Sequence, residues 1–141
     1  RMPDLSPDAL AERATQARAA LARLDGAHVR GDDDRRCDTL LAERLGAALL
    51  LHDAHEDLAT LRPIGSPVQQ LQSIFLLMPT ATDDDWAVIA RRMARVPESA
   101  ASYRASLEAG LATGAVSAPR QVESVAEQLD AWLPDGDAPG W

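Results

Sequence analysis

The sequence contains no lysine, a single cysteine and few aromatic residues. Its 14 basic residues are all arginine and stand against 22 Asp and Glu, which gives a formal net charge of −8. Proteins bind the phosphates of nucleic acids and anionic membranes through basic patches. The excess of acidic residues therefore argues against nonspecific binding to either partner. Cys37 alone cannot form an internal disulfide framework, and no apolar run reaches the roughly 20 residues of a membrane span. We therefore expect neither a nucleic-acid nor a membrane partner, and we assign the chain to the cytoplasm.

Alanine and leucine make up much of the apolar content. Hydrophobic residues account for 46% of the 141 positions, whereas aromatic residues account for only 4%. Leucine, alanine and valine must therefore build the core, and the first two favour helices by intrinsic propensity. Apolar residues recur at helical spacing along the chain, and no convincing alternation of period two is present.

Cap and stop residues divide this pattern into helices. Ser6 before Pro7 is a helix start, Thr82 with Asp85 three residues later resembles a capping box, and Gly114 is a helix stop. The predicted helices cover residues 7–25, 33–60, 67–78, 83–96, 97–113 and 119–133. The predicted fold is all-α, with about six antiparallel-leaning helices in an irregular bundle that is part of a larger helical fold.

Two further expectations concern how these helices pack. The helix at 67–78 is apolar nearly all round, which is typical of a central and fully buried helix. Trp86, Tyr103 and Trp132 lie on helical stripes, so core packing is a better interpretation than a ligand-stacking set.

One short stretch, 52–56, contains the only cluster of residue types that bind metals. On a continuous helix, His52, His55 and Glu56 would share one side and could hold zinc or iron. The spacing differs from the zinc-peptidase pattern, and the second Glu-x-x-His pair of a di-iron bundle is missing. We therefore interpret these side chains as polar residues of a long helix.

The remaining candidates also lack the partners that catalysis or binding needs. The aspartates at 32–34 and 83–85 have no EF-hand glycine or distal glutamate, so they are interpreted as helix N-terminal charges. Cys37 has no accompanying catalytic histidine or asparagine. Ser66, Ser99 and Ser102 lack a Gly-x-Ser-x-Gly context, and no phosphate-binding glycine loop is present. We expect no catalytic, cofactor-binding or metal-binding residue in this chain.

Three ordered stretches are more specific than any of these candidates. They are residues 1–10, residues 63–69 followed by Met78-Pro79-Thr80, and residues 96–107 followed by Pro119-Arg120-Gln121-Val122. In that order they resemble the N-terminal region of the bacterial family called domain of unknown function 885, over nearly the whole chain.

The resemblance implies a role and a set of partners. Members of that family are several times longer, mostly helical and similar to zincin metallopeptidases, and their zinc motif lies in the C-terminal half. Nothing in this sequence matches that motif, so no zinc or catalytic residue is carried over. We expect a chain trimmed at both ends, with a helical N-terminal region at 1–133 and a linker or frayed end, rich in Pro, Gly and Asp, at 134–141.

The implied function is that of a non-catalytic helical scaffold. It would form one wall of the substrate cleft in a longer zinc metallopeptidase, with zinc as the cofactor of the parent only. Its partners would be the missing C-terminal catalytic portion and, through an uncovered apolar face, a second copy of itself. The alternatives are a stand-alone helical interaction module and, less favoured, a metal-binding or cofactor-binding bundle that uses the His52 cluster.

Overall fold

The computed structural model describes residues 2–26 and 31–132. In chain order the helices are α1 (Pro7–Asp25), α2 (Asp32–Asp53), the 3-10 helix η1 (Glu56–Ala59), α3 (Pro67–Leu76), α4 (Asp83–Met93), α5 (Val96–Thr113) and α6 (Pro119–Trp132). No strand occurs in these two ranges, so the all-α prediction is confirmed. The predicted linker at 134–141 lies outside the described residues.

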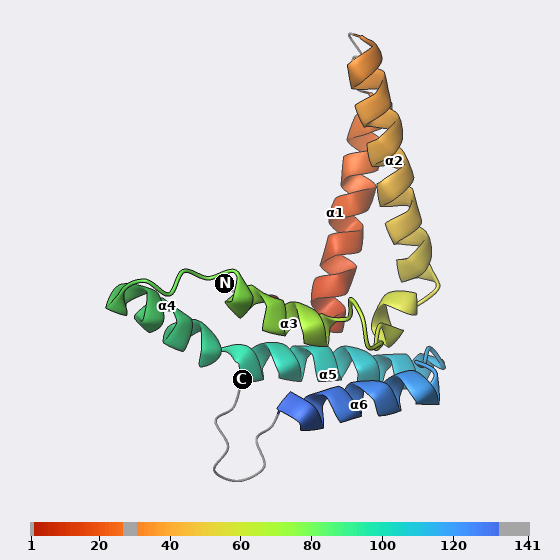
Figure 1. The fold of residues 1–141 in the computed structure, drawn as a ribbon. Helices are drawn as coiled ribbons and strands as arrows, with labels where there is room; N and C mark the ends of the chain where they lie inside the picture. Colours follow the sequence, from red (N-terminus) through yellow and green to blue (C-terminus); the bar gives the residue numbers. More distant parts are fainter. Residues whose placement is uncertain (1, 27–30, 133–141) are drawn as a thin grey trace.

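The helices form a protruding hairpin and a layer (Figure 1). The antiparallel pair α1 and α2 stands away from a layer made by α3, α4, α5 and α6. Helix α5 runs through the middle of this layer, with α3 along one side and the antiparallel α6 along the other. None of the helices in the described ranges is long and apolar enough to cross a membrane.

Local signals at the helix ends act as the sequence predicts. The Ser6 hydroxyl accepts a hydrogen bond from the Ala9 amide at 3.3 Å and so caps α1. Thr82 and Asp85 form a reciprocal capping box, with bonds of 3.2 and 2.9 Å. Gly114 takes the left-handed conformation, with φ of 80°, and ends α5.

The second helix is shorter than predicted. It ends at Asp53 instead of continuing to about residue 60, because His55 takes a left-handed conformation with φ of 60° and η1 follows. Apolar periodicity does not reveal this break, which is fixed by contacts of η1 with the rest of the chain. One of them joins Asp57 Oδ2 to His52 Nδ1 at 2.6 Å.

The prediction that 67–78 forms the most buried helix is wrong. Helix α3 contains no buried residue, and Leu76 and Leu77 are 70% and 88% exposed. Trp86 is likewise 55% exposed on α4, contrary to its predicted core packing. Helix α3 lies at the edge of the layer and α4 at its far end, and there Leu76, Leu77 and Trp86 remain exposed. The buried apolar residues are Met2, Leu5, Ala14, Ile89, Tyr103 and Val125.

Gly110 lets the loop after α2 approach α5 closely. A Cβ at this position would lie 2.7 Å from the Ala115 carbonyl oxygen and 3.2 Å from that of Leu58. Gly46 in α2 has open space around the corresponding position.

These two glycines form a matched pair for mutation. Alanine in a helix interior normally stabilises by about 1 kcal/mol relative to glycine, so Gly46→Ala should raise the free energy of unfolding by up to that amount. Gly110→Ala should instead lower it by roughly 1–2 kcal/mol, because backbone atoms must move away from the new methyl group. Urea denaturation followed by circular dichroism measures both. An equal gain in the two variants would contradict the close approach.

Candidate functional site

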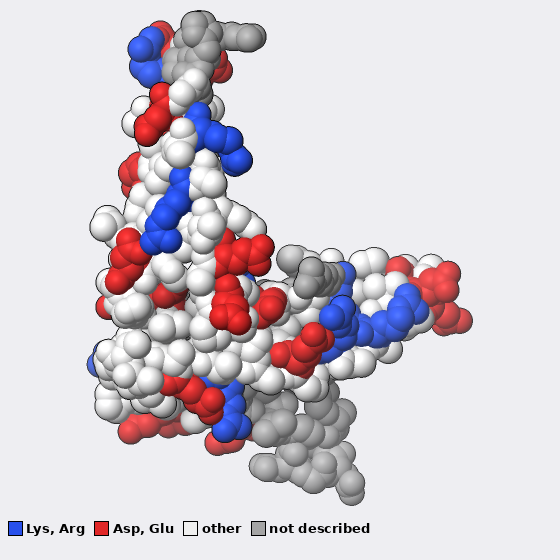
Figure 2. Space-filling model, turned by 180° about the vertical axis from the view of Figure 1, so that it is seen from behind, with Lys and Arg blue, Asp and Glu red and all other residues white. Residues whose placement is uncertain are grey.

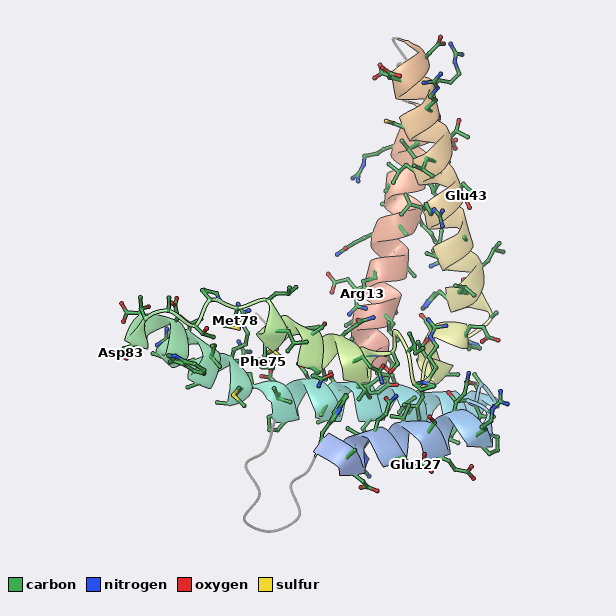
Figure 3. All side chains as sticks on the ribbon, viewed as in Figure 1. Arg13, Glu43, Phe75, Met78, Asp83 and Glu127 are labelled. Atoms are coloured by element: carbon green, nitrogen blue, oxygen red, sulfur yellow. The ribbon has the colours of Figure 1, made fainter. Side chains whose placement is uncertain are left out.

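The apolar faces of α3, α5 and α6 meet in one groove. Its volume is about 680 Å³. Its lining includes Val68, Leu71 and Phe75 from α3, Ala100, Tyr103 and Leu107 from α5, and Val122, Leu129 and Trp132 from α6. Each set follows helical spacing, so one face of each helix contributes. Figure 3 shows the labelled Phe75 at the end of α3, beside the start of α5.

Uncharged side chains line the whole groove, and three of them are aromatic. The only phenylalanine and the only tyrosine of the chain lie here, together with Trp132. Tyr103 is 8% exposed, which confirms its predicted packing, whereas Leu129 and Met93 are 42% and 48% exposed. The groove is therefore closed at its floor and open to solvent along its rim.

The Tyr103 side chain also anchors the segment that follows η1. Its hydroxyl donates a hydrogen bond to the Thr60 carbonyl at 2.6 Å. Burial raises the pKa of Tyr103 to about 12, because the phenolate form would lose its hydration. Next to it, the Ser117 hydroxyl donates to the Ala59 carbonyl and accepts from the Leu61 amide at 3.2 Å. The backbone at 59–61 is thus tied to α5 and to the loop before α6.

A chain of amides connects α3 to α6. Gln69 Oε1 accepts from the Ser66 amide at 3.0 Å and from its hydroxyl at 2.6 Å. Gln69 Nε2 donates to Gln128 Oε1 at 2.8 Å, and Gln128 Nε2 donates to the Pro63 carbonyl at 3.0 Å. Ser66 is fully buried by this arrangement. These bonds set the spacing of two walls of the groove.

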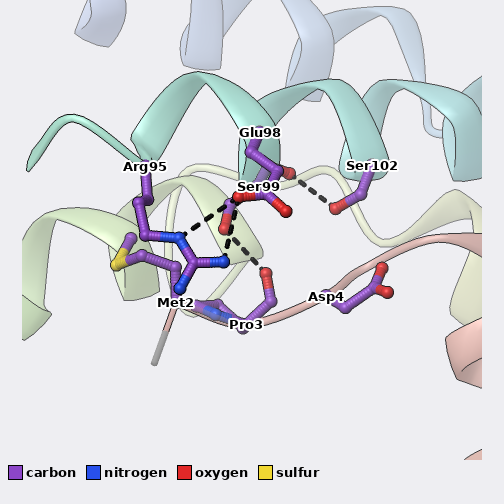
Figure 4. Close-up of a pocket in the computed structure, with 7 residues that line it drawn as sticks. All are labelled: Met2, Pro3, Asp4, Arg95, Glu98, Ser99 and Ser102. Atoms are coloured by element: carbon purple, nitrogen blue, oxygen red, sulfur yellow. Dashed lines mark hydrogen bonds and ion pairs between the residues drawn. The ribbon is translucent and has the colours of Figure 1, made fainter. Parts of the chain in front are cut away.

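Serines on α5 hold the extended N-terminal segment (Figure 4). The Ser99 hydroxyl donates to the Pro3 carbonyl at 2.7 Å, as Figure 4 shows. Ser102 Oγ accepts from the Leu5 amide at 3.0 Å. Ser106 donates to the Leu5 carbonyl at 2.5 Å. No catalytic role is predicted for Ser66, Ser99 or Ser102. Ser66 is the N-cap of α3, as its position before Pro67 predicts, and it forms a capping box with Gln69. Ser99 and Ser102 instead bind distant backbone, which no local motif records.

The predicted helical face of His52, His55 and Glu56 does not form. His52 lies in the last turn of α2, His55 in the left-handed turn and Glu56 at the start of η1. His52 pairs instead with Asp57, and both side chains are about one quarter exposed. Within residues 2–26 and 31–132, no group of three His, Cys, Asp or Glu side chains is arranged to hold a metal ion.

The acidic runs occupy the positions predicted for them. Residues 32–34 form the first turn of α2, and residues 83–85 form the first turn of α4. Asp32 and Asp33 make ion pairs of 3.5 Å with Arg35 and Arg36. Cys37 is exposed. On the face shown in Figure 2, charged side chains of both signs are spread over the hairpin and α4.

These observations define an all-α protein that is built on one central helix and carries an open, uncharged groove. The chain belongs to the family described as bacterial protein of unknown function (DUF885), whose model matches residues 1–140. No curated protein matched the chain. The first and third of the stretches that carry the sequence resemblance meet at α5, and the second is connected to α6. Residues 3–5 bind its serines, and Ser66 and Gln69 connect through Gln128 to α6.

Loss of the Ser106 hydroxyl should destabilise the chain more than loss of an exposed serine. Ser106→Ala leaves the Leu5 carbonyl without its donor in a buried site, which should cost about 1–3 kcal/mol of unfolding free energy. Ser73→Ala removes a 3.0 Å bond to Gln70 on the exposed side of α3 and should change stability by less than about 0.5 kcal/mol. Thermal denaturation of both variants gives the comparison, and equal effects would contradict the structural role of the buried bond between Ser106 and Leu5.

Stability should fall above pH 10 because of Tyr103. The folded-state pKa is near 12 and the unfolded value is 10, so the unfolded chain loses its proton first as the pH rises. Roughly 2–3 kcal/mol should therefore be lost progressively between pH 10 and 12. The chain has no lysine and no second tyrosine to mask the effect. Urea denaturation at pH 9 and pH 11.5 should show a steeper loss in the native chain than in Tyr103→Phe; parallel losses would contradict it.

Proposed function

We propose that this chain is the non-catalytic helical region of a larger zinc-dependent metallopeptidase, in which it forms one wall of the substrate cleft. The groove between α3, α5 and α6 packs against the C-terminal catalytic portion of that parent. The observation that carries the proposal is the groove itself, which is about 680 Å³ in volume and has no charged residue in its lining. An open apolar surface of this kind is typical of a protein contact.

The exposed residues around the groove agree with a packing role. Leu76 is the last residue of α3 and Leu77 follows it in the chain. Both are among the most exposed leucines of the described residues. Covering one such side chain contributes about 1.5–3 kcal/mol before the costs of association. Without the catalytic portion, the same surface would pair with a second copy of the chain.

The test is to produce the chain and the remainder of its parent as separate polypeptides. The remainder should bind zinc, and it should hydrolyse peptides only when the chain is added. Leu129→Asp places a charge in the groove and should abolish both the complex and the self-association of the isolated chain, followed by light scattering. Leu50→Asp is the matched control, since Leu50 is 74% exposed on α2 and away from the groove.

Three results would count against the proposal. Stoichiometric zinc bound to the isolated chain would make it a metal protein in its own right. An open reading frame that stops soon after Trp141 would favour the stand-alone interaction module. Equal loss of the complex in the Leu129 and Leu50 variants would show that the groove is not the contact.

A further inference from the structure

The groove between α3, α5 and α6 offers few hydrogen-bond partners to a segment that enters it. Among the described residues of its lining, polar side-chain groups come from Gln72, Tyr103 and Trp132 alone. The Tyr103 hydroxyl is already used, because it donates to the Thr60 carbonyl. An extended segment would bury backbone amides and carbonyls here without partners, whereas a helix satisfies its own. The groove therefore favours a helix as its occupant.

An acidic row (Glu123, Glu127 and Asp130) follows the groove along the outer edge of α6. Its members stand at i, i+4 and i+7, so they share one face of the helix. Figure 3 shows the labelled Glu127 on the side of α6 that points away from α5. Each acid comes one position after a residue that lines the groove, and the pairs are Val122-Glu123, Ala126-Glu127 and Leu129-Asp130.

The charge of the acidic row is available to a partner. Its three side chains are exposed, and none of them forms an ion pair within residues 2–26 and 31–132. The facing wall, α3, contains no charged residue, and the whole chain has a formal net charge of −8. Electrostatic attraction for a bound segment is therefore concentrated along one edge of the groove, and it favours a basic segment.

We propose that the groove binds one amphipathic helix whose apolar face is bordered on one side by lysine or arginine residues. The apolar face packs on α3, α5 and α6, and the basic residues pair with the acidic row. Val122 and Leu129 are 43% and 42% exposed, so the aliphatic stems of the basic residues can cover them while the charged ends reach the carboxylates. This inference rests on the proposed function, since it specifies the segment of the C-terminal portion that enters the groove.

The experiment measures the binding of synthetic peptides to the isolated chain by fluorescence anisotropy. The probe is a labelled peptide with leucine at i, i+3, i+4 and i+7 and with lysine along one border of the leucine stripe. One control peptide has glutamate at the lysine positions, and another has a central proline that interrupts the helix.

The lysine peptide should bind the most tightly of the three. Its affinity should exceed that of the glutamate peptide by roughly tenfold at low salt, and high salt should reduce this difference because it screens exposed charges. The proline peptide should bind more weakly than the lysine peptide, because its backbone groups are no longer all paired within a helix.

Two variants of matched charge test the acidic row. The triple change Glu123→Gln, Glu127→Gln and Asp130→Asn should weaken binding of the lysine peptide by roughly tenfold. A second triple variant removes as many exposed carboxylates from the hairpin and should have little effect. Its changes are Glu12→Gln, Asp25→Asn and Glu43→Gln.

A further pair of variants tests the groove itself. Ala126→Arg places a large side chain with the same charge as the peptide in the lining, so it should abolish binding of the lysine peptide. Ala47→Arg is the matched control, since Ala47 is exposed on α2 and away from the groove. Circular dichroism checks that each variant folds.

The outcomes separate this inference from the proposed function. Equal affinity for the three peptides, equal effects of the two triple variants, or full binding by Ala126→Arg would overturn the inference and leave the contact with the remainder of the parent standing. If the lysine peptide binds as expected but the remainder of the parent does not bind, the inference is supported and the proposed function is contradicted.

Discussion

The architecture depends on hydrogen bonds from side chains of α5 to backbone that has no helix of its own. Extended and turn segments carry amide and carbonyl groups that need partners once they are buried. Ser99, Ser102 and Ser106 supply them for residues 3–5, and Tyr103 supplies one for Thr60. Small side chains are required for this, because the backbone must come close enough for the hydroxyls to reach it. In the same way, the absence of a side chain at Gly110 lets the backbone of η1 come close to α5.

Helix α5 thereby has two unlike faces. Its serine face binds the N-terminal segment, and its apolar face forms the floor of the groove with Ala100, Tyr103 and Leu107. Tyr103 belongs to both, since its ring lines the groove while its hydroxyl holds the Thr60 carbonyl. The Thr60 carbonyl lies in the segment before α3, and Gln128 and Gln69 connect this same segment to α6 and α3.

The sequence predicts the features that local chemistry decides. The starts of α1 and α4 and the end of α5 follow from Ser6, Thr82 and Gly114, whose effects act within one turn. The end of α2 was missed because the left-handed turn at His55 depends on Asp57 and on η1. The sequence predicts the groove residues as stripes along single helices, but it does not predict that these stripes face one another. Periodicity shows which face of a helix is apolar and does not show which helix packs against that face.

The failed prediction for α3 has the same physical origin as the groove. An apolar pattern records how much surface a helix tends to bury, whereas the exposure in the structure records how much the described residues cover. On α3 the two differ clearly, because Leu76 and the following Leu77 remain mostly exposed. Trp86 on α4 shows the same difference. The helices of the layer therefore carry apolar surface that contacts among the described residues leave exposed, and this is the surface that the proposed function assigns to a partner.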